Sequence, residues 1–227
     1  MRAVNLRMIG RFGNQLFQWA FARAYCELYD CELRCDPWIG EKVFNISNAR
    51  IQEPFQDVHS EMDYVPGKPN FELRGYFQSQ KSIIYARKQV QEWLTWRKAF
   101  EDYHDKILCH LRRGDYFGYG YPVVSDASYV NACRKFGLPL RDAESISEEK
   151  PTGKGFVLDF WRLCNAPVML RANSSFSWWA ATLAKNQRTF APIIEGLEGG
   201  KEHDVEFVEG NWPRFTNLPF VTDLHLS

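Results

Sequence analysis

The stretch Lys106-Ile-Leu-Cys-His-Leu-Arg-Arg-Gly-Asp-Tyr116 joins a short apolar run to a cluster of charged residues. The apolar run is typical of a buried strand, which would deliver Arg112, Arg113 and Asp115 at its C-terminal end. Two adjacent guanidiniums repel each other and are costly to desolvate, so the cluster indicates a phosphate or carboxylate bound by at least one of them. The residues also allow a structural alternative, in which Arg112 pairs with Asp115 and Arg113 is solvated.

The composition limits the class of protein. The chain has 227 residues, enough for one large domain or two small ones. Lys and Arg total 28, as do Asp and Glu, so no overall basic field is available to attract nucleic acid. Aromatic residues make up 15% of the chain, which fits either a sugar-handling protein or an aromatic core.

The cysteines and the apolar runs indicate where the protein works. No cysteine spacing fits a zinc template, so we expect reduced core thiols, no metal site and a reducing compartment. No apolar run approaches the roughly 18 residues that a membrane span needs, and no signal peptide is apparent. The expected location is therefore the cytoplasm, either free or peripheral to a membrane. The six cysteines are Cys26, Cys31, Cys35, Cys109, Cys133 and Cys164.

The N-terminal region reads as a strand, a glycine turn and a helix. Residues 3–9 form the expected strand, and apolar residues from Leu16 to Leu28 recur at three- and four-residue steps. Asn14 is the expected N-cap of that helix. The turn at Gly10 and Gly13 would allow close backbone approach to a ligand, although an ordinary turn between strand and helix is the favoured interpretation of these residues alone.

A second strand, polar turn and helix follow later in the chain. Residues 167–170 form the expected strand, and residues 173–177 lead into a helix that ends near Lys185. Small polar residues at a helix N-terminus bind phosphate through hydroxyl and backbone N–H groups. The alternative is that Asn173 or Ser174 merely caps the helix.

The remaining pattern is mixed. A possible cap for the helix over 126–136 is Asp126, and the Gly- and Tyr-rich residues 116–121 are expected to form a loop. The other expected strands are 31–35, 71–77, 188–191 and 205–208, the other expected helices are 82–100 and 156–164, and the expected irregular segments are 36–70 and 139–155.

Three separated blocks resemble, in the same order, the signature blocks of the α-1,2-fucosyltransferase family, which is glycosyltransferase family 11-like. These are Gly10-Arg-Phe-Gly-Asn-Gln-Leu-Phe-Gln18, His110-Leu-Arg-Arg-Gly-Asp-Tyr116 and Ala172-Asn-Ser-Ser-Phe-Ser-Trp-Trp-Ala180. Arg74-Gly-Tyr-Phe-Gln-Ser-Gln-Lys81 also looks like a block of that family. The first block is similar to the opening loop of protein O-fucosyltransferases, which belong to the same wider superfamily.

The resemblance implies an α/β fold that is GT-B-like, with two Rossmann-type halves and mostly parallel sheets. It implies an acceptor-side half over 1–100 and a GDP-sugar-binding half over 101–227. The implied reaction is an inverting, metal-independent transfer of fucose, or a related sugar, from a GDP-sugar such as GDP-fucose to a glycan hydroxyl, in α-1,2 linkage and with no further cofactor. The membrane alternative for location would then be one that carries the glycan acceptor.

The resemblance also assigns roles to individual residues. Arg112 contacts the pyrophosphate, Asp159 reads guanine, and Asp115 orients Arg112. By their positions, His110 and Asp115 are the candidates for the base, and the alternative is that either residue is purely structural. The implied donor-binding residues are Arg112, Asp159, Asn173, Ser174, Ser175 and Ser177, and those facing the sugar or acceptor are Gly13, Asn14 and Gln15.

The sequence departs from the family in two places. Arg11 and Phe12 replace the usual Gly-Leu, and no apolar strand ending in Ser-Asp-Asp is apparent between 136 and 156. We therefore expect a C-terminal half reduced by one strand. This leaves an alternative function, a relative that binds a nucleotide sugar or glycan without transferring sugar. A nucleic-acid module using Arg112 and Arg113 is disfavoured by the neutral charge balance.

Overall fold

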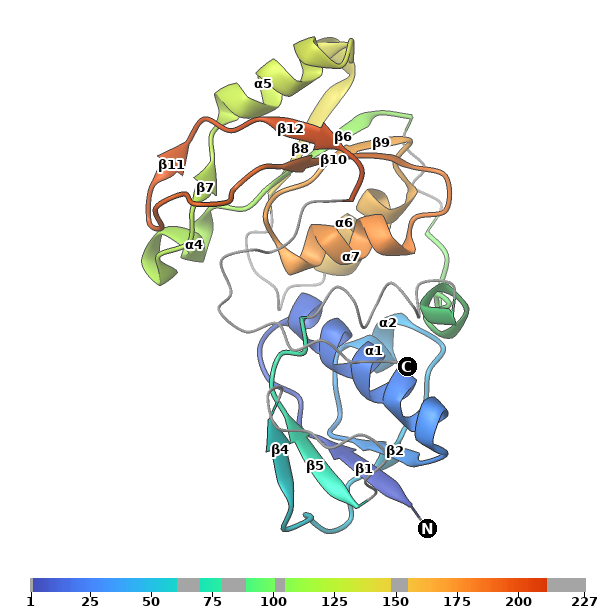
Figure 1. The fold of residues 1–227 in the computed structure, drawn as a ribbon. Helices are drawn as coiled ribbons and strands as arrows, with labels where there is room; N and C mark the ends of the chain where they lie inside the picture. The colour runs from blue at the N-terminus through green and yellow to red at the C-terminus, as the bar shows by residue number, and fades with distance from the viewer. Residues whose placement is uncertain (1, 61–69, 79–88, 101–104, 148–154, 212–227) are drawn as a thin grey trace. The chain divides into compact units, whose positions relative to one another are not determined.

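The computed structural model describes residues 2–60, 70–78, 89–100, 105–147 and 155–211. The described residues form two compact units, one up to Ala99 and the other from Phe100. Each unit is built on its own five-stranded sheet with helices packed against it (Figure 1). The predicted α/β class with mostly parallel sheets is confirmed.

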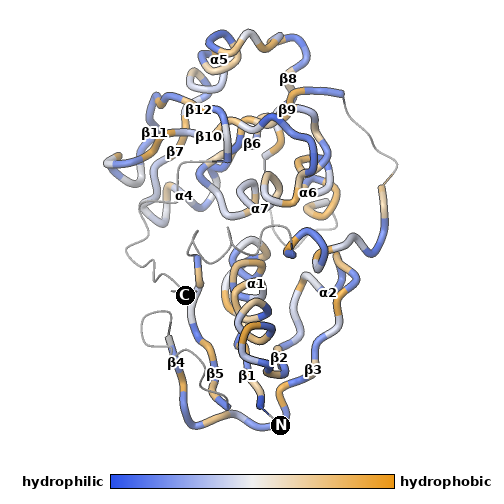
Figure 2. The backbone as a smooth tube through the Cα atoms, turned by 45° about the vertical axis from the view of Figure 1, so that its right-hand side comes forward, coloured by the Kyte–Doolittle hydropathy of each residue, from blue (hydrophilic) through white to orange (hydrophobic). Residues whose placement is uncertain are grey.

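The first unit contains a sheet in which every pairing is parallel, in the order β3-β2-β1-β5-β4. Helix α1 packs against β1 and β2, and much of it is coloured as hydrophobic in Figure 2. A helical segment also covers 89–93. The elements are β1 (Ala3–Leu6), α1 (Phe12–Tyr29), β2 (Glu32–Cys35), α2 (Gly40–Val43), β3 (Ala49–Arg50), β4 (Val58–Ser60) and β5 (Phe71–Arg74).

The second unit contains a sheet in the order β12-β10-β9-β6-β8, parallel except where β12 pairs with β10. Helix α5 lies on one side of this sheet, and α6 and α7 lie on the other (Figure 1). A separate two-stranded parallel sheet joins β7 to β11. The elements are β6 (Ile107–Leu111), α4 (Gly114–Tyr119), β7 (Val123–Val124), α5 (Asp126–Lys135), η1 (Leu140–Asp142), β8 (Ala143–Ser147), α6 (Phe156–Asn165), β9 (Val168–Leu170), α7 (Ser175–Leu183), β10 (Arg188–Pro192), β11 (Glu202–His203) and β12 (Phe207–Glu209).

Both cores are rich in aromatic and thiol side chains. In the first unit, Phe21 stacks on Phe77 with ring centroids 4.4 Å apart. In the second, Tyr129 and Cys133 of α5 pack with Leu170 and Phe190 of the sheet. All six cysteines are free and five of them are buried, as the sequence predicted.

Several predicted boundaries are wrong for local reasons. Arg11, in an extended conformation, precedes α1, so Asn14 lies inside the first turn and does not cap it. Ser125 caps α5 by accepting a hydrogen bond from the Ser128 N–H, so Asp126 is the first helical residue. The expected helix over 82–100 falls partly on residues outside the described ranges, and its described helical part ends at residue 93.

The main correction is a strand where a connection was expected. Residues Ala143–Ser147 form β8, which pairs parallel with β6 along its whole length. Only Ile146 is buried in this strand, and it is the register partner of His110. An edge strand with one inward apolar side chain lacks the apolar run that marks a central strand. The sheet therefore has a strand in the region where the sequence predicted none.

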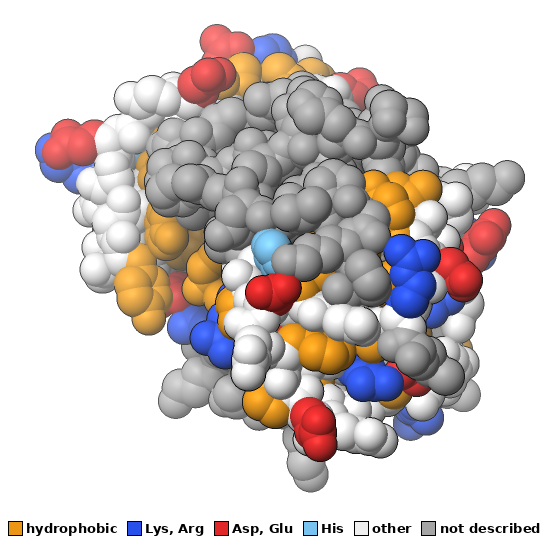
Figure 3. All heavy atoms as spheres, turned by 60° about the horizontal axis from the view of Figure 1, so that its bottom comes forward, with side chains coloured by type: hydrophobic (Ala, Val, Ile, Leu, Met, Phe, Trp, Pro, Cys, Tyr) orange, Lys and Arg blue, Asp and Glu red, His pale blue; other side chains and the backbone are white. Residues whose placement is uncertain are grey.

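The surface shows no strong separation of charge on the face seen in Figure 3. There, the described basic and acidic side chains lie interspersed, in keeping with the 28 residues of each sign. Among the residues that the structure describes, no helix is long and apolar enough to cross a membrane.

The packing of β8 can be tested by truncating its inward side chain. Ile146→Ala should lower the free energy of unfolding by about 2–4 kcal/mol, because a buried isoleucine loses contacts and leaves a cavity. Glu144→Ala, on the same strand but partly exposed, should change it by less than about 0.5 kcal/mol. Urea denaturation followed by circular dichroism measures both. Equal effects of the two substitutions would contradict the packing of this strand in the core.

Candidate anion site at the ends of β6 and β9

The candidate site lies where the connections of the second sheet change direction. From β6 the chain continues to β8 on one side, and it then returns to β9 on the other side of β6. In open α/β sheets, ligands bind outside the C-terminal ends of strands at such a switch point. The segments after β6 and β9 contain Arg112 and Asn173, so the topology brings together two of the three predicted blocks.

Arg112 is held by two neighbours from its own segment. Its Nη2 lies 2.8 Å from one carboxylate oxygen of Asp115 and donates to the other at 3.1 Å. The guanidinium carbon also lies 5.1 Å from the ring centroid of Tyr116, a cation–π distance. Only 8% of the Arg112 side chain is exposed. The predicted salt bridge is therefore present, and it fixes the guanidinium at the strand end.

Arg113 has a different environment. It pairs with Asp126 at the start of α5, and its side chain is 34% exposed. The expectation that Arg113 is merely solvated is thus wrong, because the side chain forms an ion pair at the surface. The two adjacent arginines avoid each other by pairing with different acids. Of the two, Arg112 is the more deeply buried.

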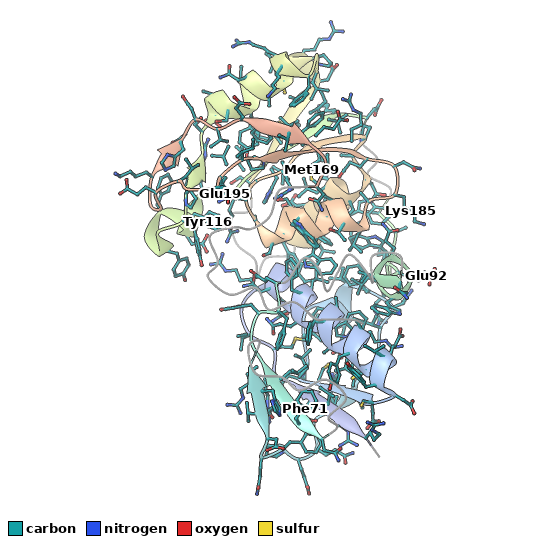
Figure 4. The ribbon with its side chains drawn as sticks, in the orientation of Figure 1. Phe71, Glu92, Tyr116, Met169, Lys185 and Glu195 are labelled. Carbon is teal, nitrogen blue, oxygen red and sulfur yellow. The ribbon has the colours of Figure 1, made fainter. Side chains whose placement is uncertain are left out.

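Helix α4 ties the segment after β6 to the segment after β9. The Tyr116 hydroxyl donates to the Asn173 carbonyl at 2.8 Å, and Asn173 Nδ2 donates to the Pro122 carbonyl at 2.9 Å. Figure 4 labels Tyr116 on this short helix. The predicted loop over 116–121 is therefore helical as far as Tyr119, and Gly120 ends the helix with a left-handed φ of 71°.

The small polar residues at the start of α7 mostly serve the turn itself. Ser174 caps the helix by accepting from the Phe176 N–H. The buried Ser177 hydroxyl lies within hydrogen-bond distance of the carbonyls of Ala172 and Ser174. Ser175, the first helical residue, is half-buried. The structure thus forms the predicted capping alternative at Ser174, and α7 begins at Ser175, shortly after β9 ends at Leu170.

Arg171 is a site residue that the sequence reasoning missed. It directly follows β9, only 2% of it is exposed, and its Nη1 donates to the Ala172 carbonyl at 3.0 Å. Burial lowers the pKa of Arg171 to about 10, which leaves it charged at neutral pH. A charged residue inside the apolar run from Val168 to Ala172 was the available signal. A second buried guanidinium therefore adds positive charge at this strand end.

His110 lies in the core beneath these arginines. It is fully buried, and its ring centroid is 5.6 Å from that of Phe176. Burial, assisted by the charges of Arg112 and Arg171, lowers the pKa of His110 to about 3. A general base must reach the proton that it removes, so this packing favours the structural alternative for His110 over a role as base.

The remaining predicted residues occupy different places. Asp159 lies in the first turn of α6, and burial raises the pKa of its carboxylate, an effect that Arg162 opposes. In the first unit, Gly13 is buried in α1. Asn14 Oδ1 accepts from Gln78 Nε2 at 2.9 Å, and Gln15 Nε2 donates to the Gly10 carbonyl at 3.3 Å.

No cluster of metal-binding side chains accompanies these residues. Among the residues that the structure describes, no group of three or more His, Cys, Asp or Glu side chains is arranged to hold a metal ion. The groups at the ends of β6 and β9 are instead two guanidiniums, one carboxylate and a helix N-terminus. Such groups suit an anion, because guanidinium N–H donors and helix N-terminal N–H groups both bind oxyanions.

Comparison with known proteins supports the resemblance found in the sequence blocks. No protein-family model matches the chain. A galactoside 2-α-L-fucosyltransferase of Caenorhabditis elegans is 25% identical over 217 residues, covering 66% of this chain and 52% of that protein. The chain thus spans about half the length of this curated relative. The relative confirms the resemblance to the α-1,2-fucosyltransferase family.

Solved structures share the fold. The NodZ α-1,6-fucosyltransferase co-crystallised with GDP is 13% identical, with a TM-score of 0.57 over 93% of this chain and 99% of that chain. The fucosyltransferase NodZ from Bradyrhizobium is 12% identical, with a TM-score of 0.56 over 92% and 98%. A mutant of Arabidopsis thaliana FUT1 in complex with GDP is 10% identical, with a TM-score of 0.50 over 84% and 70%.

The neutral state of His110 predicts how stability depends on pH. The unfolded chain binds a proton at this residue below its ordinary pKa of 6.5, whereas the folded chain does not until about pH 3. Its contribution to stability is therefore present above pH 6.5 and is lost as the pH falls. In wild type this residue should account for about 1.4 kcal/mol of lost stability per pH unit between pH 6 and pH 4. Denaturation of His110→Leu over this range should show a slope smaller by that amount, and an unchanged slope would contradict a neutral, buried ring.

Proposed function

We propose that this protein, which resembles α-1,2-fucosyltransferases in sequence and shares its fold with solved fucosyltransferases, is itself a glycosyltransferase. Its donor would be GDP-fucose and its acceptor a glycan hydroxyl. The observation that carries the proposal is that the adjacent parallel strands β6 and β9 lead into the buried Arg112 and into the N-terminal turn of α7, at the switch point of the sheet. That edge combines two buried guanidiniums with a helix N-terminus.

In this proposal, the second unit binds the donor. Arg112 contacts the pyrophosphate, Asp115 orients it, and Ser175 with the first N–H groups of α7 binds further phosphate oxygens. Asn173, Ser174 and Ser177 shape this turn through their own hydrogen bonds. Asp159 accepts from guanine N–H groups, a role carried over from the resemblance. Burial raises the pKa of Asp159, and hydrogen bonds from guanine would stabilise its charged form.

The proposed chemistry is a single displacement with inversion. The acceptor hydroxyl oxygen forms a bond to the anomeric carbon of fucose as the bond from that carbon to the phosphate oxygen breaks. The hydroxyl proton passes to water or to a base, and GDP leaves with the electron pair. The leaving group gains negative charge in the transition state, where a prepositioned Arg112 and the positive end of α7 stabilise it. The mechanism therefore needs no metal ion. His110 is not proposed as the base, because its buried ring would have to leave the core to reach an acceptor.

The first unit is proposed to bind the acceptor. Gly13, Asn14 and Gln15 follow the turn at Gly10 and would face the acceptor or the reacting sugar. The Caenorhabditis elegans relative is a galactoside 2-α-L-fucosyltransferase, which supports a galactoside acceptor and linkage to its 2-hydroxyl.

The alternative function, binding without transfer, was motivated by an absent strand. Strand β8 removes that reason, since it pairs with β6 in the region where the sequence predicted no strand. Sustained release of GDP from GDP-fucose, with lactose as the acceptor, would eliminate this alternative.

Adjacent arginines provide a matched test of the donor site. Arg112→Ala should weaken GDP binding by about 10- to 100-fold, as expected when one charge-assisted contact to phosphate is lost. Arg113→Ala removes the same side chain from a surface ion pair with Asp126, so it should change affinity by less than about threefold. Isothermal titration calorimetry measures both. Absent GDP binding in wild type, or equal losses in both variants, would overturn the assignment of Arg112.

A further inference from the structure

The first sheet has a switch point of its own. From β1 the chain continues to β2 on one side, whereas β5 lies against the other side of β1. Because β1 and β5 are parallel, the segments that follow them begin at the same edge of the sheet, where open α/β sheets bind ligands. These segments contain Gly10 and the stretch Tyr76–Gln78, of which Tyr76 has no role in the proposals above.

In the turn after β5, the first of two adjacent aromatic rings is exposed and the second is buried. Phe77 is 1% exposed and stacks on Phe21, although its φ of 48° is unfavourable for a residue with a side chain. Tyr76 is 44% exposed. Such backbone strain persists only where the surrounding structure holds it, and it is concentrated at functional sites. Here the buried Phe77 anchors a turn that presents Tyr76 to solvent.

The glycine turn after β1 meets Tyr76 directly. A Cβ atom added to Gly10 would lie 3.0 Å from Tyr76 Cε1 and 2.6 Å from Asn14 Nδ2. Gly10 also has a left-handed φ of 73°. Both features require glycine at this position. The ring of Tyr76 and the amide of Asn14 are thus packed around one backbone turn, and Gln78 donates to that same amide at 2.9 Å.

We propose that Tyr76 is the aromatic platform for the acceptor sugar, with the amides of Asn14 and Gln78 binding its hydroxyl groups. An exposed ring flanked by neutral amides suits a neutral pyranose, whose C–H face packs on an aromatic face and whose hydroxyls pair with amide donors and acceptors. The occupant is therefore one neutral sugar ring of the acceptor glycan. This inference rests on the proposed function for its role in transfer, while its sugar-binding chemistry is measurable without turnover.

The kinetic test compares substitutions at Tyr76 with a surface control. Tyr76→Ala should raise the KM for lactose about threefold to tenfold, the range expected for one lost stacking contact, with kcat and GDP affinity little changed. Tyr76→Phe keeps the ring and should restore the KM. Leu28→Ala removes another exposed apolar side chain of the same unit, 53% exposed on α1, and should have no effect. A loss of GDP affinity in Tyr76→Ala would instead indicate stacking on the guanine base and overturn the proposal.

A second measurement separates this inference from the proposed function. Saturation-transfer difference NMR with lactose reports sugar binding whether or not fucose is transferred. We expect lactose signals with wild type and Tyr76→Phe and their loss with Tyr76→Ala. Lactose signals without GDP binding would contradict the proposed function but would still support the sugar site. An absent lactose signal in wild type, or a signal unchanged in Tyr76→Ala, would overturn the sugar site whatever the result for GDP.

Discussion

The parallel pairing of β6 and β9 is the constraint on which the second unit depends. Register partners along this pair include Cys109 and Leu170, so the chain leaves both strands at one edge. The connections then lead to α4 and α7 with Arg112 and Arg171 close to that edge. Burying two guanidiniums is costly unless a carboxylate, a carbonyl or a bound anion offsets it. Asp115 and the Ala172 carbonyl provide part of this compensation, and the proposed pyrophosphate would provide the rest.

The fold could be predicted wherever one segment carries its own signal. Strand β6 and helices α5 and α6 have apolar runs or helical periodicity, and the structure contains them close to the predicted limits. Strand β8 has one inward apolar residue, Ile146, and its identity as a strand comes from pairing with β6. Helix α4 combines glycines and tyrosines that favour a loop, yet Tyr116 gains a hydrogen bond to Asn173 and a contact with Arg112. Tertiary contacts of this kind are invisible in a local pattern.

The site shows the same division between local and distant information. The sequence identified Arg112 and its partner Asp115, because both lie within four residues of a recognisable strand. It could not show that Ser174 and Ser177 would use their hydroxyls within their own turn, since that depends on the exact path of the chain into α7. Nor could it show that His110 would be enclosed by Phe176 and two cations. The sequence shows which strand ends carry polar residues. Packing decides which of those residues face a ligand.

The central claim is that the ends of β6 and β9 bind the phosphates of a GDP-sugar. The most direct measurement is an NMR titration of the full chain with GDP, following the backbone amides across both units. We expect saturable shifts concentrated at residues 110–116 and 173–178. Shifts confined to other residues, or no saturable shifts at millimolar GDP, would contradict a donor site at these strand ends.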